Sequence, residues 1–177
     1  MELEGKRVGI LVADMFRDEE VFAPFDYLEE LGASVLLVGL ERGPVTGKLG
    51  GRVEAEKGIA EVRASDFDAL ILPGGQAPER LRLDARVLDL VREFDRGEGV
   101  LAAICHGPQI LISAGLLKGR RATCYVGIRD DVRLAGALYS DEPVVVDGHL
   151  VTSRKPEDIP AFNDAVRRGL TAPVRAR

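Results

Sequence analysis

The chain has 177 residues, of which 46% are hydrophobic and 30% charged, a composition typical of a globular protein. Its formal net charge of −5 argues against nucleic acid as the main partner, because phosphate binding requires a basic face. The N-terminus has no cationic start, and no apolar run approaches the roughly 20 residues of a membrane helix. We therefore expect one domain over residues 1–177 that is cytoplasmic and does not enter a membrane.

Strands and helices are predicted to alternate in the first part of the chain. Residues 6–13 are expected to form a buried strand, Asp18 to cap a helix over 18–31, and 34–40 to form the next strand. A strand, a helix and a strand with short connections form a βαβ unit, which implies a parallel sheet. Residues 43–62 are rich in glycine and partly alternate, so we predict a β-hairpin-like excursion there.

The same alternation continues toward the C-terminus. The remaining predicted elements are a core strand at 67–72, an amphipathic helix at 84–96, a buried strand at 100–104, a helix at 109–117, a strand at 121–125, a short helix at 128–135, a hairpin with arms 143–146 and 150–152, and a helix at 156–170 before a loose tail to 177. The pattern predicts a three-layer α/β sandwich with a mostly parallel central sheet, whose ligands bind at the carboxyl ends of the strands.

Only four residues, Cys105 to Pro108, separate the strand at 100–104 from the helix that follows. Such a tight turn strains its first residue and raises that side chain above the sheet, as in a nucleophile elbow. Cys105 occupies this position, and Pro108 suits a first helical turn. The free N–H groups and dipole of the helix favour a thiolate there and are suited to holding an oxyanion. The alternative is a small buried hydrophobic residue, the usual fate of a free cysteine.

The few cysteines and histidines limit the other chemistry of the chain. Cys105 and Cys124 are the two cysteines, so no disulfide framework is expected, and nothing in their spacing requires them to pair. With His106 and His149 as the two histidines, the chain lacks ligands for a zinc site, and we expect no metal or organic cofactor. His149 follows a predicted turn and is expected to be exposed.

Two motifs lie where strands are predicted to end, Leu-Pro-Gly-Gly at 72–75 and Ala-Ile-Cys-His-Gly-Pro-Gln at 103–109. With these motifs, the chain resembles the PfpI branch of the DJ-1/PfpI superfamily from Lys6 to about Val166. Further matching stretches are 18–24, 46–48, 77–80, 125–131, 144–148 and 152–154. The resemblance implies a flavodoxin-like sandwich, similar to that of class I amidotransferases, and a cysteine-dependent hydrolase. It leaves two substrate classes open: peptide bonds, for a stress-related intracellular peptidase, or methylglyoxal and its adducts, for a deglycase or glyoxalase.

A class I glutamine amidotransferase also places a cysteine on this turn, but it takes its histidine and glutamate from a later His-x-Glu stretch. The later histidine here, His149, is followed by Leu150 and Val151, which disfavours that activity. A different alternative is a non-catalytic, redox-sensing stress protein that acts through oxidation of Cys105.

The resemblance implies partners for the nucleophile on three segments. It places Glu20 against Cys105, where the carboxyl would keep its proton and donate a hydrogen bond to sulfur. It makes His106 the catalytic partner of Cys105, oriented by Glu79 of a neighbouring subunit, so that the site requires a homo-oligomer. Taken alone, Glu20 complements a helix dipole, His106 caps a helix or lies in a subunit contact, and Glu79 is a solvated loop acid.

Backbone amides and one aromatic residue complete the predicted site. Gly74 and Gly75 end a strand, and we expect the amides of Gly75 and His106 to form an oxyanion hole; an ordinary turn is the alternative. Tyr125 is expected either to line the substrate pocket or to be a half-buried structural residue.

Overall fold

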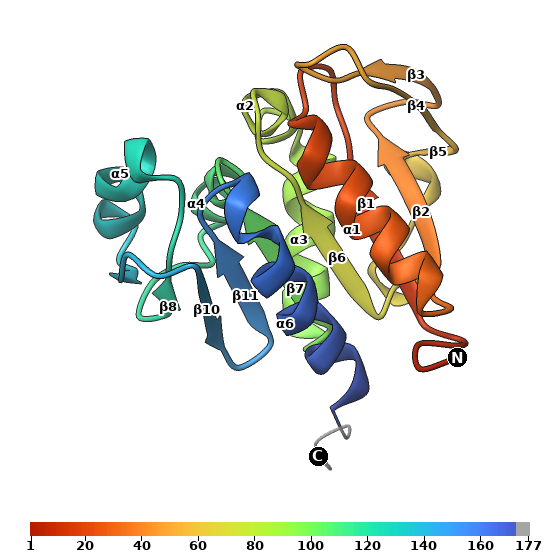
Figure 1. The fold of residues 1–177 in the computed structure, drawn as a ribbon. Coiled ribbons are helices and arrows are strands. Elements are labelled where there is room, and N and C mark those ends of the chain that lie inside the picture. The colour runs from red at the N-terminus through yellow and green to blue at the C-terminus, as the bar shows by residue number, and fades with distance from the viewer. Residues whose placement is uncertain (173–177) are drawn as a thin grey trace.

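A seven-stranded sheet forms the centre of the computed structural model, which describes residues 1–172 (Figure 1). Its strands are β1 (Arg7–Leu11), β2 (Ser34–Gly39), β5 (Lys57–Gly58), β6 (Ala69–Leu72), β7 (Val100–Ile104), β10 (Val144–Asp147) and β11 (Leu150–Ser153). Their order is β10-β11-β7-β6-β1-β2-β5, and all neighbours are parallel except β10 and β11. The predicted α/β sandwich is confirmed, whereas residues 173–177 of the predicted tail lie outside the described residues.

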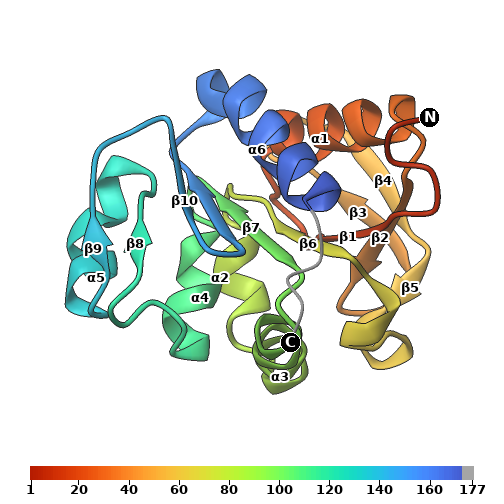
Figure 2. The same ribbon diagram turned by 90° about the horizontal axis from the view of Figure 1, so that it is seen from below.

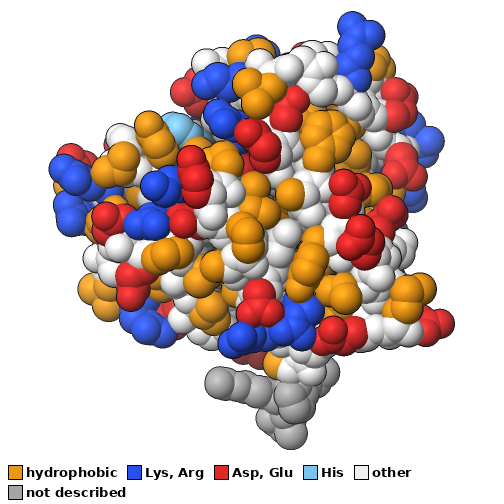
Figure 3. Space-filling model, in the orientation of Figure 1, with side chains coloured by type: hydrophobic (Ala, Val, Ile, Leu, Met, Phe, Trp, Pro, Cys, Tyr) orange, Lys and Arg blue, Asp and Glu red, His pale blue; other side chains and the backbone are white. Residues whose placement is uncertain are grey.

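Helices cover both faces of the sheet. They are α1 (Asp18–Glu30), α2 (Ala77–Leu81), α3 (Ala85–Arg96), α4 (Pro108–Ala114), α5 (Arg129–Leu134) and α6 (Ile159–Thr171). Figure 2 shows α1 and α6 side by side on one face, with α2, α3 and α4 on the other. Figure 3 shows the face that carries α1 and α6, where apolar side chains are interspersed with acidic ones. Within residues 1–172 no helix combines the length and the apolar character that a membrane crossing requires.

The smaller elements flank the main sheet. Two short sheets pair β3 (Gly43–Thr46) with β4 (Arg52–Ala55) and β8 (Arg121–Ala122) with β9 (Leu138–Tyr139). Single 3-10 turns span Ile59–Glu61, Ala64–Asp66, Val126–Ile128 and Pro156–Asp158. The antiparallel pair β3 and β4 confirms the hairpin predicted in residues 43–62.

Burial explains why the central strands could be located from the sequence. Every residue of β6 and β7 is buried, since helices cover both faces of these strands. Strands buried on both faces have continuous apolar sequences rather than alternating ones. The ends of these apolar runs therefore mark the ends of β6 and β7. Because the two strands are parallel neighbours, both end at the same edge of the sheet.

Two local predictions were wrong, and one helix was missed. Asp18 does not cap α1, whose N-cap is Arg17; its buried carboxylate instead accepts hydrogen bonds from Leu49 N (2.8 Å) and Gly51 N (2.7 Å) in the turn between β3 and β4. The helix α2 was not predicted. The strand expected at 121–125 stops at Ala122, because the next amides bond elsewhere: Thr123 N donates to Thr152 Oγ1 and Tyr125 N donates to Cys105 O.

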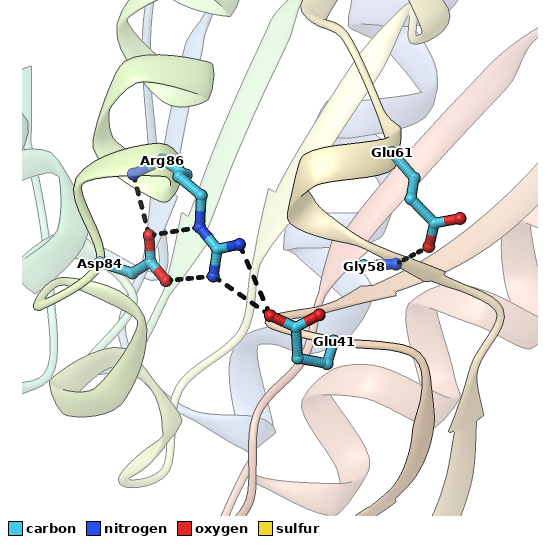
Figure 4. A network of polar contacts seen from close by, with 5 residues as sticks. All are labelled: Glu41, Gly58, Glu61, Asp84 and Arg86. Carbon is cyan, nitrogen blue, oxygen red and sulfur yellow. Dashed lines mark hydrogen bonds and ion pairs between the residues drawn. The ribbon is translucent and has the colours of Figure 1, made fainter.

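Polar side chains fix the start of α3 relative to the loop after β2 (Figure 4). Asp84 caps α3 by accepting from Arg86 N at 2.9 Å, and the Arg86 guanidinium donates to Asp84 Oδ2 at 2.7 Å. The same guanidinium reaches Glu41 at 3.4 Å, and nearby Glu61 accepts from Gly58 N at 2.8 Å. The contact between Arg86 and Glu41 therefore connects the start of α3 to the loop between β2 and β3.

Candidate active site

The loops that follow β1 and β6 are joined by backbone hydrogen bonds. Arg17 N donates to Gly74 O at 3.1 Å and Gln76 N donates to Met15 O at 2.8 Å, while Phe16 and Gly75 form an isolated β-bridge. The elbow after β7 lies against the same loops, since a Cβ atom at Gly74 would stand 2.7 Å from Cys105 Cβ. The carboxyl ends of β1, β6 and β7 therefore meet at one edge of the sheet.

Cys105 has the backbone of a nucleophile elbow. Its φ is +62°, a left-handed conformation that costs a non-glycine residue free energy. The turn is tight because Gly107 N bonds to Ile104 O at 2.8 Å, and a Cβ atom at Gly107 would lie 2.1 Å from Leu72 O. The amides of Gly75 and His106 both donate toward the Cys105 sulfur. This arrangement also suits an oxyanion held close to the sulfur.

Glu20 lies beside this sulfur and has no exposed surface. Its Oε2 accepts from Gly74 N at 2.7 Å, and within residues 1–172 its Oε1 has no nitrogen or oxygen partner. Burial raises the pKa of Glu20 from its ordinary 4.5 to about 8, although the bond from Gly74 acts in the opposite direction. Because the carboxyl contacts the Cys105 thiol, a proton on Glu20 can be donated to sulfur.

The ionisation of Cys105 differs from what the sequence suggested. Burial is the largest cause that raises the pKa of Cys105 to about 12, and the charge of an ionised Glu20 is the second. The amides of Gly75 and His106 lower this pKa. Cys105 is only 8% exposed, so water contributes little to solvating a thiolate. A protonated Glu20 removes the repulsion and adds a hydrogen-bond donor. The thiolate is therefore favoured when the proton resides on Glu20.

His106 is turned back toward the nucleophile. Its Nδ1 lies 3.2 Å from Cys105 Sγ, and its ring stacks on Tyr125 with centroids 4.8 Å apart. Burial lowers the pKa of His106; the charge of Glu79 raises it and that of Lys48 lowers it. The imidazole is thus neutral at physiological pH and can accept a proton from the thiol.

Other predicted site residues lie around this centre. Gly75 has φ +77°, and a Cβ atom there would be 2.4 Å from Met15 O, so this position requires glycine. Glu79 is exposed on α2, and within the described part of the chain it forms no hydrogen bond with His106, although its charge acts on that ring. Tyr125, 39% exposed, supports the imidazole from one side.

The prediction that His149 is exposed was wrong. Its side chain is 25% exposed, and its Nε2 lies 2.8 Å from Asp95 Oδ1 on α3. It precedes β11, whose other end is beside the elbow, so it takes no part in this site. Cys124 is a second free, fully buried cysteine. In the part of the chain that the structure describes, no group of three or more His, Cys, Asp or Glu is arranged to hold a metal ion.

Arg17 and Lys48 were missed as neighbours of the site. The pKa of Arg17 is raised mainly by its hydrogen bond to Glu19 and, to a smaller extent, by the charges of Glu20 and Cys105. Lys48, in the turn between β3 and β4, acts on His106. A stretch including Lys48 belongs to the resemblance described above, but no local signal places a hairpin turn beside an elbow almost sixty residues later.

A model of the DJ-1/PfpI family matches residues 6–168. The chain belongs to the DJ-1/PfpI family. The resemblance drawn from the motifs is thereby confirmed. Among curated DJ-1/PfpI relatives, deglycase PfpI of Pyrococcus furiosus is 48% identical over 157 residues, which cover 88% of this chain and 94% of the relative. Protein/nucleic acid deglycase 2 of Escherichia coli is 44% identical over 170 residues, 94% of this chain and 99% of the relative.

Solved DJ-1/PfpI structures share the same fold. A ThiJ/PfpI domain protein from Brachyspira murdochii superposes with a TM-score of 0.91 at 29% identity, over 97% of this chain and 99% of that one. DJ-1beta of Drosophila melanogaster gives a TM-score of 0.88, also at 29% identity, over 94% of this chain and 90% of that one.

Proposed function

We propose that the protein is a cysteine-dependent deglycase or glyoxalase that acts on methylglyoxal and its adducts with amines. The observation that carries the proposal is the placement of the Cys105 sulfur between two backbone amides, the Glu20 carboxyl and the His106 imidazole at 3.2 Å. The names of the relatives in Pyrococcus furiosus and Escherichia coli support this substrate class. No metal or cofactor is needed for the reaction, which is hydrolysis coupled to an internal rearrangement.

The first step forms a bond between Cys105 sulfur and the former aldehyde carbon of methylglyoxal. With the free aldehyde, the carbonyl oxygen becomes an oxyanion that the amides of Gly75 and His106 stabilise, and the thiol proton passes to His106 Nδ1 and then to that oxygen. With an amine adduct, the amine leaves from the same carbon and takes the proton. Both routes give the same hemithioacetal on Cys105.

The second step is a proton transfer between the two oxygenated carbons of the hemithioacetal. The carbon bound to sulfur loses a proton and is oxidised, while the neighbouring ketone carbon gains one and is reduced, so no external oxidant is required. His106 and Glu20 are the groups beside sulfur that can accept and return this proton. Water then hydrolyses the resulting thioester, which releases lactate and regenerates the Cys105 thiol.

The test measures lactate and free amine released from methylglyoxal-treated amino acids by the native protein and by Cys105→Ala. Both products are expected from the native protein and neither from the variant, while Cys124→Ala, which alters the other buried cysteine, retains turnover. Activity that survives in Cys105→Ala refutes the proposal.

Peptide hydrolysis is the second candidate, because the same thiol and amides can attack a peptide carbonyl. A Bacillus subtilis relative provisionally named a cysteine protease, YraA, is 48% identical over 159 residues, 89% of this chain and 94% of that one. Casein incubated beside the methylglyoxal assay separates the two. Cleavage of casein that is lost in Cys105→Ala, without lactate release, favours the peptidase.

We propose further that the active protein is a homo-oligomer in which Glu79 of one subunit orients His106 of another. Glu79 is exposed on α2 close to the site, as such a role requires. Light scattering after size-exclusion chromatography tests for assembly. Mixing Glu79→Gln with Cys105→Ala subunits tests the shared site, because hybrid assemblies regain intact sites only if the two residues act across an interface.

Oxidation sensing is a third candidate that uses the same sulfur. A sulfinic acid on Cys105 would accept hydrogen bonds from both amides and from protonated Glu20. General stress protein 18 of Bacillus subtilis is 43% identical over 162 residues, 90% of this chain and 94% of that one. Selective oxidation of Cys105 by mild peroxide, found by mass spectrometry without turnover of any carbonyl or peptide, favours this role. The cytoplasmic location and the single domain over residues 1–177 stay predictions.

A further inference from the structure

The turn between β3 and β4 is fixed against the start of α1. Its own backbone closes through Gly47 N to Gly51 O at 2.7 Å, and the Asp18 carboxylate accepts from Leu49 N and Gly51 N at 2.8 and 2.7 Å. Asp18 is 8% exposed, and Cβ atoms at Gly47 or Gly51 would each lie 2.4 Å from its oxygens. The turn therefore has a defined position rather than that of a free loop tip.

A chain of backbone contacts connects this turn to the nucleophile. Lys48 N donates to Phe16 O at 2.8 Å, Phe16 forms a β-bridge with Gly75, and the Gly75 amide donates toward Cys105 sulfur. Paired backbones lie about 5 Å apart, so the two successive pairings, Lys48 with Phe16 and Phe16 with Gly75, separate the backbones of Lys48 and Gly75 by about 10 Å. The four-carbon stem of a lysine side chain can cover much of this distance.

Arg17 and Lys48 are two cations whose charges act on the groups around the sulfur. Arg17 also lies near the thiol, but its guanidinium is bonded to Glu19 at 2.8 and 3.2 Å. Among the described residues Lys48 forms no ion pair, and its charge reaches His106, where Glu79 is the opposing charge. With Glu20 and His106 both neutral near pH 7, the charges of Glu79 and Lys48 are the two that act on the imidazole beside the sulfur, and Lys48 is the positive one.

We infer that Lys48 is a specificity-determining residue that binds an anionic group of the substrate. The inference rests on the proposed function and names its preferred substrate class: methylglyoxal adducts of amino acids, whose amine carries a carboxylate. A carboxylate two bonds from the departing nitrogen would lie over the site when the former aldehyde carbon is at Cys105 Sγ. Lys48 recognises this group and takes no part in the covalent steps.

Alkylation of Cys105 tests the charge preference without any need for turnover. Iodoacetate is an anion and iodoacetamide is its neutral counterpart, so the ratio of their rate constants reports the local field, and any change in thiol reactivity itself cancels. Lys48→Met is expected to lower this ratio about threefold or more at low salt, and Lys48→Glu to lower it further. Lys118→Met removes an exposed lysine after α4 and should leave the ratio unchanged.

Turnover then separates this inference from the proposed function. For the native protein, kcat/KM should be higher for the adduct of an amino acid than for that of its carboxamide, and Lys48→Met should abolish the difference mainly through KM. A lowered alkylation ratio without turnover of either adduct supports Lys48 as an anion site and refutes the proposed function. An unchanged alkylation ratio in both Lys48 variants overturns the inference, even when the protein turns over methylglyoxal adducts.

Discussion

Replacing Glu20 with glutamine should stabilise the protein in a pH-dependent way. The carboxyl is fully buried, and its pKa is raised to about 8. At any pH between the pKa of Glu20 in the unfolded chain and its pKa in the folded protein, Glu20 takes up a proton when the chain folds. This uptake costs free energy, and a neutral glutamine does not incur that cost. The substituted side chain retains the contacts, because its amide oxygen accepts from Gly74 N and its amide nitrogen donates to sulfur.

The magnitude follows from the two pKa values. Below pH 4.5 the carboxyl is protonated in both states, so the charge contributes no difference between the proteins. As pH rises, the native protein loses stability relative to the variant, by about 3 kcal/mol at pH 7 and about 5 kcal/mol above pH 8, at about 1.4 kcal/mol for each pKa unit. These values are a large part of the about 5–15 kcal/mol that stabilises a typical domain.

Urea denaturation of both proteins from pH 4.5 to 8.5, at one protomer concentration, measures this difference. Glu19→Gln provides a matched control one residue away. The hydrogen bond from Arg17 lowers the pKa of Glu19, so that variant should show no growing advantage between pH 5 and 8. A stability difference for Glu20→Gln that stays constant over this range would falsify the assignment of the proton to the Glu20 carboxyl.

Three further predictions concern the elbow and α3. Glu20→Leu should slow alkylation of Cys105 about tenfold, because a donor to the thiolate is lost; equal rates would exclude the contact. Gly74→Ala should cost about 1–3 kcal/mol in denaturation, since its Cβ would lie 2.6 Å from the Glu20 carboxyl, and an unaltered midpoint would contradict this geometry. Asp84→Ala should cost about 1 kcal/mol through loss of the α3 cap, whereas Asp89→Ala, at an exposed site within α3, should cost less; equal losses would argue against the cap.

The sequence was sufficient where a local pattern had one physical explanation. The continuous apolar run before Cys105 predicts a strand buried on both faces, and the short connection to Pro108 leaves little alternative to an elbow. Because parallel strands end at one edge, the meeting of Gly74 with this elbow was also predictable, and the family resemblance placed Glu20 there. These conclusions depend on strand ends, which periodicity and composition locate well.

The parts that failed depend on contacts between distant segments. Asp18 has the sequence signature of a helix cap, but its carboxylate bonds to amides more than thirty residues away. His149 is paired with Asp95, which is 54 residues earlier, and neither local sequence indicates the other. The ionisation of Cys105 was misjudged because the helix dipole is readable from sequence, whereas the burial that opposes it is not.

The strained backbone of Cys105 is held from two sides, since its N–H donates to Ser153 O and its C=O accepts from Tyr125 N. Ser153 belongs to β11, the last strand, and Tyr125 to the segment before α5. The strained conformation of Cys105 is therefore maintained by hydrogen bonds from two segments that come later in the sequence. Separation of either region would allow the residue to relax and the sulfur to turn away from its amides. Exchange of the Tyr125 amide proton with solvent therefore becomes a direct reporter of how often the nucleophile is out of position.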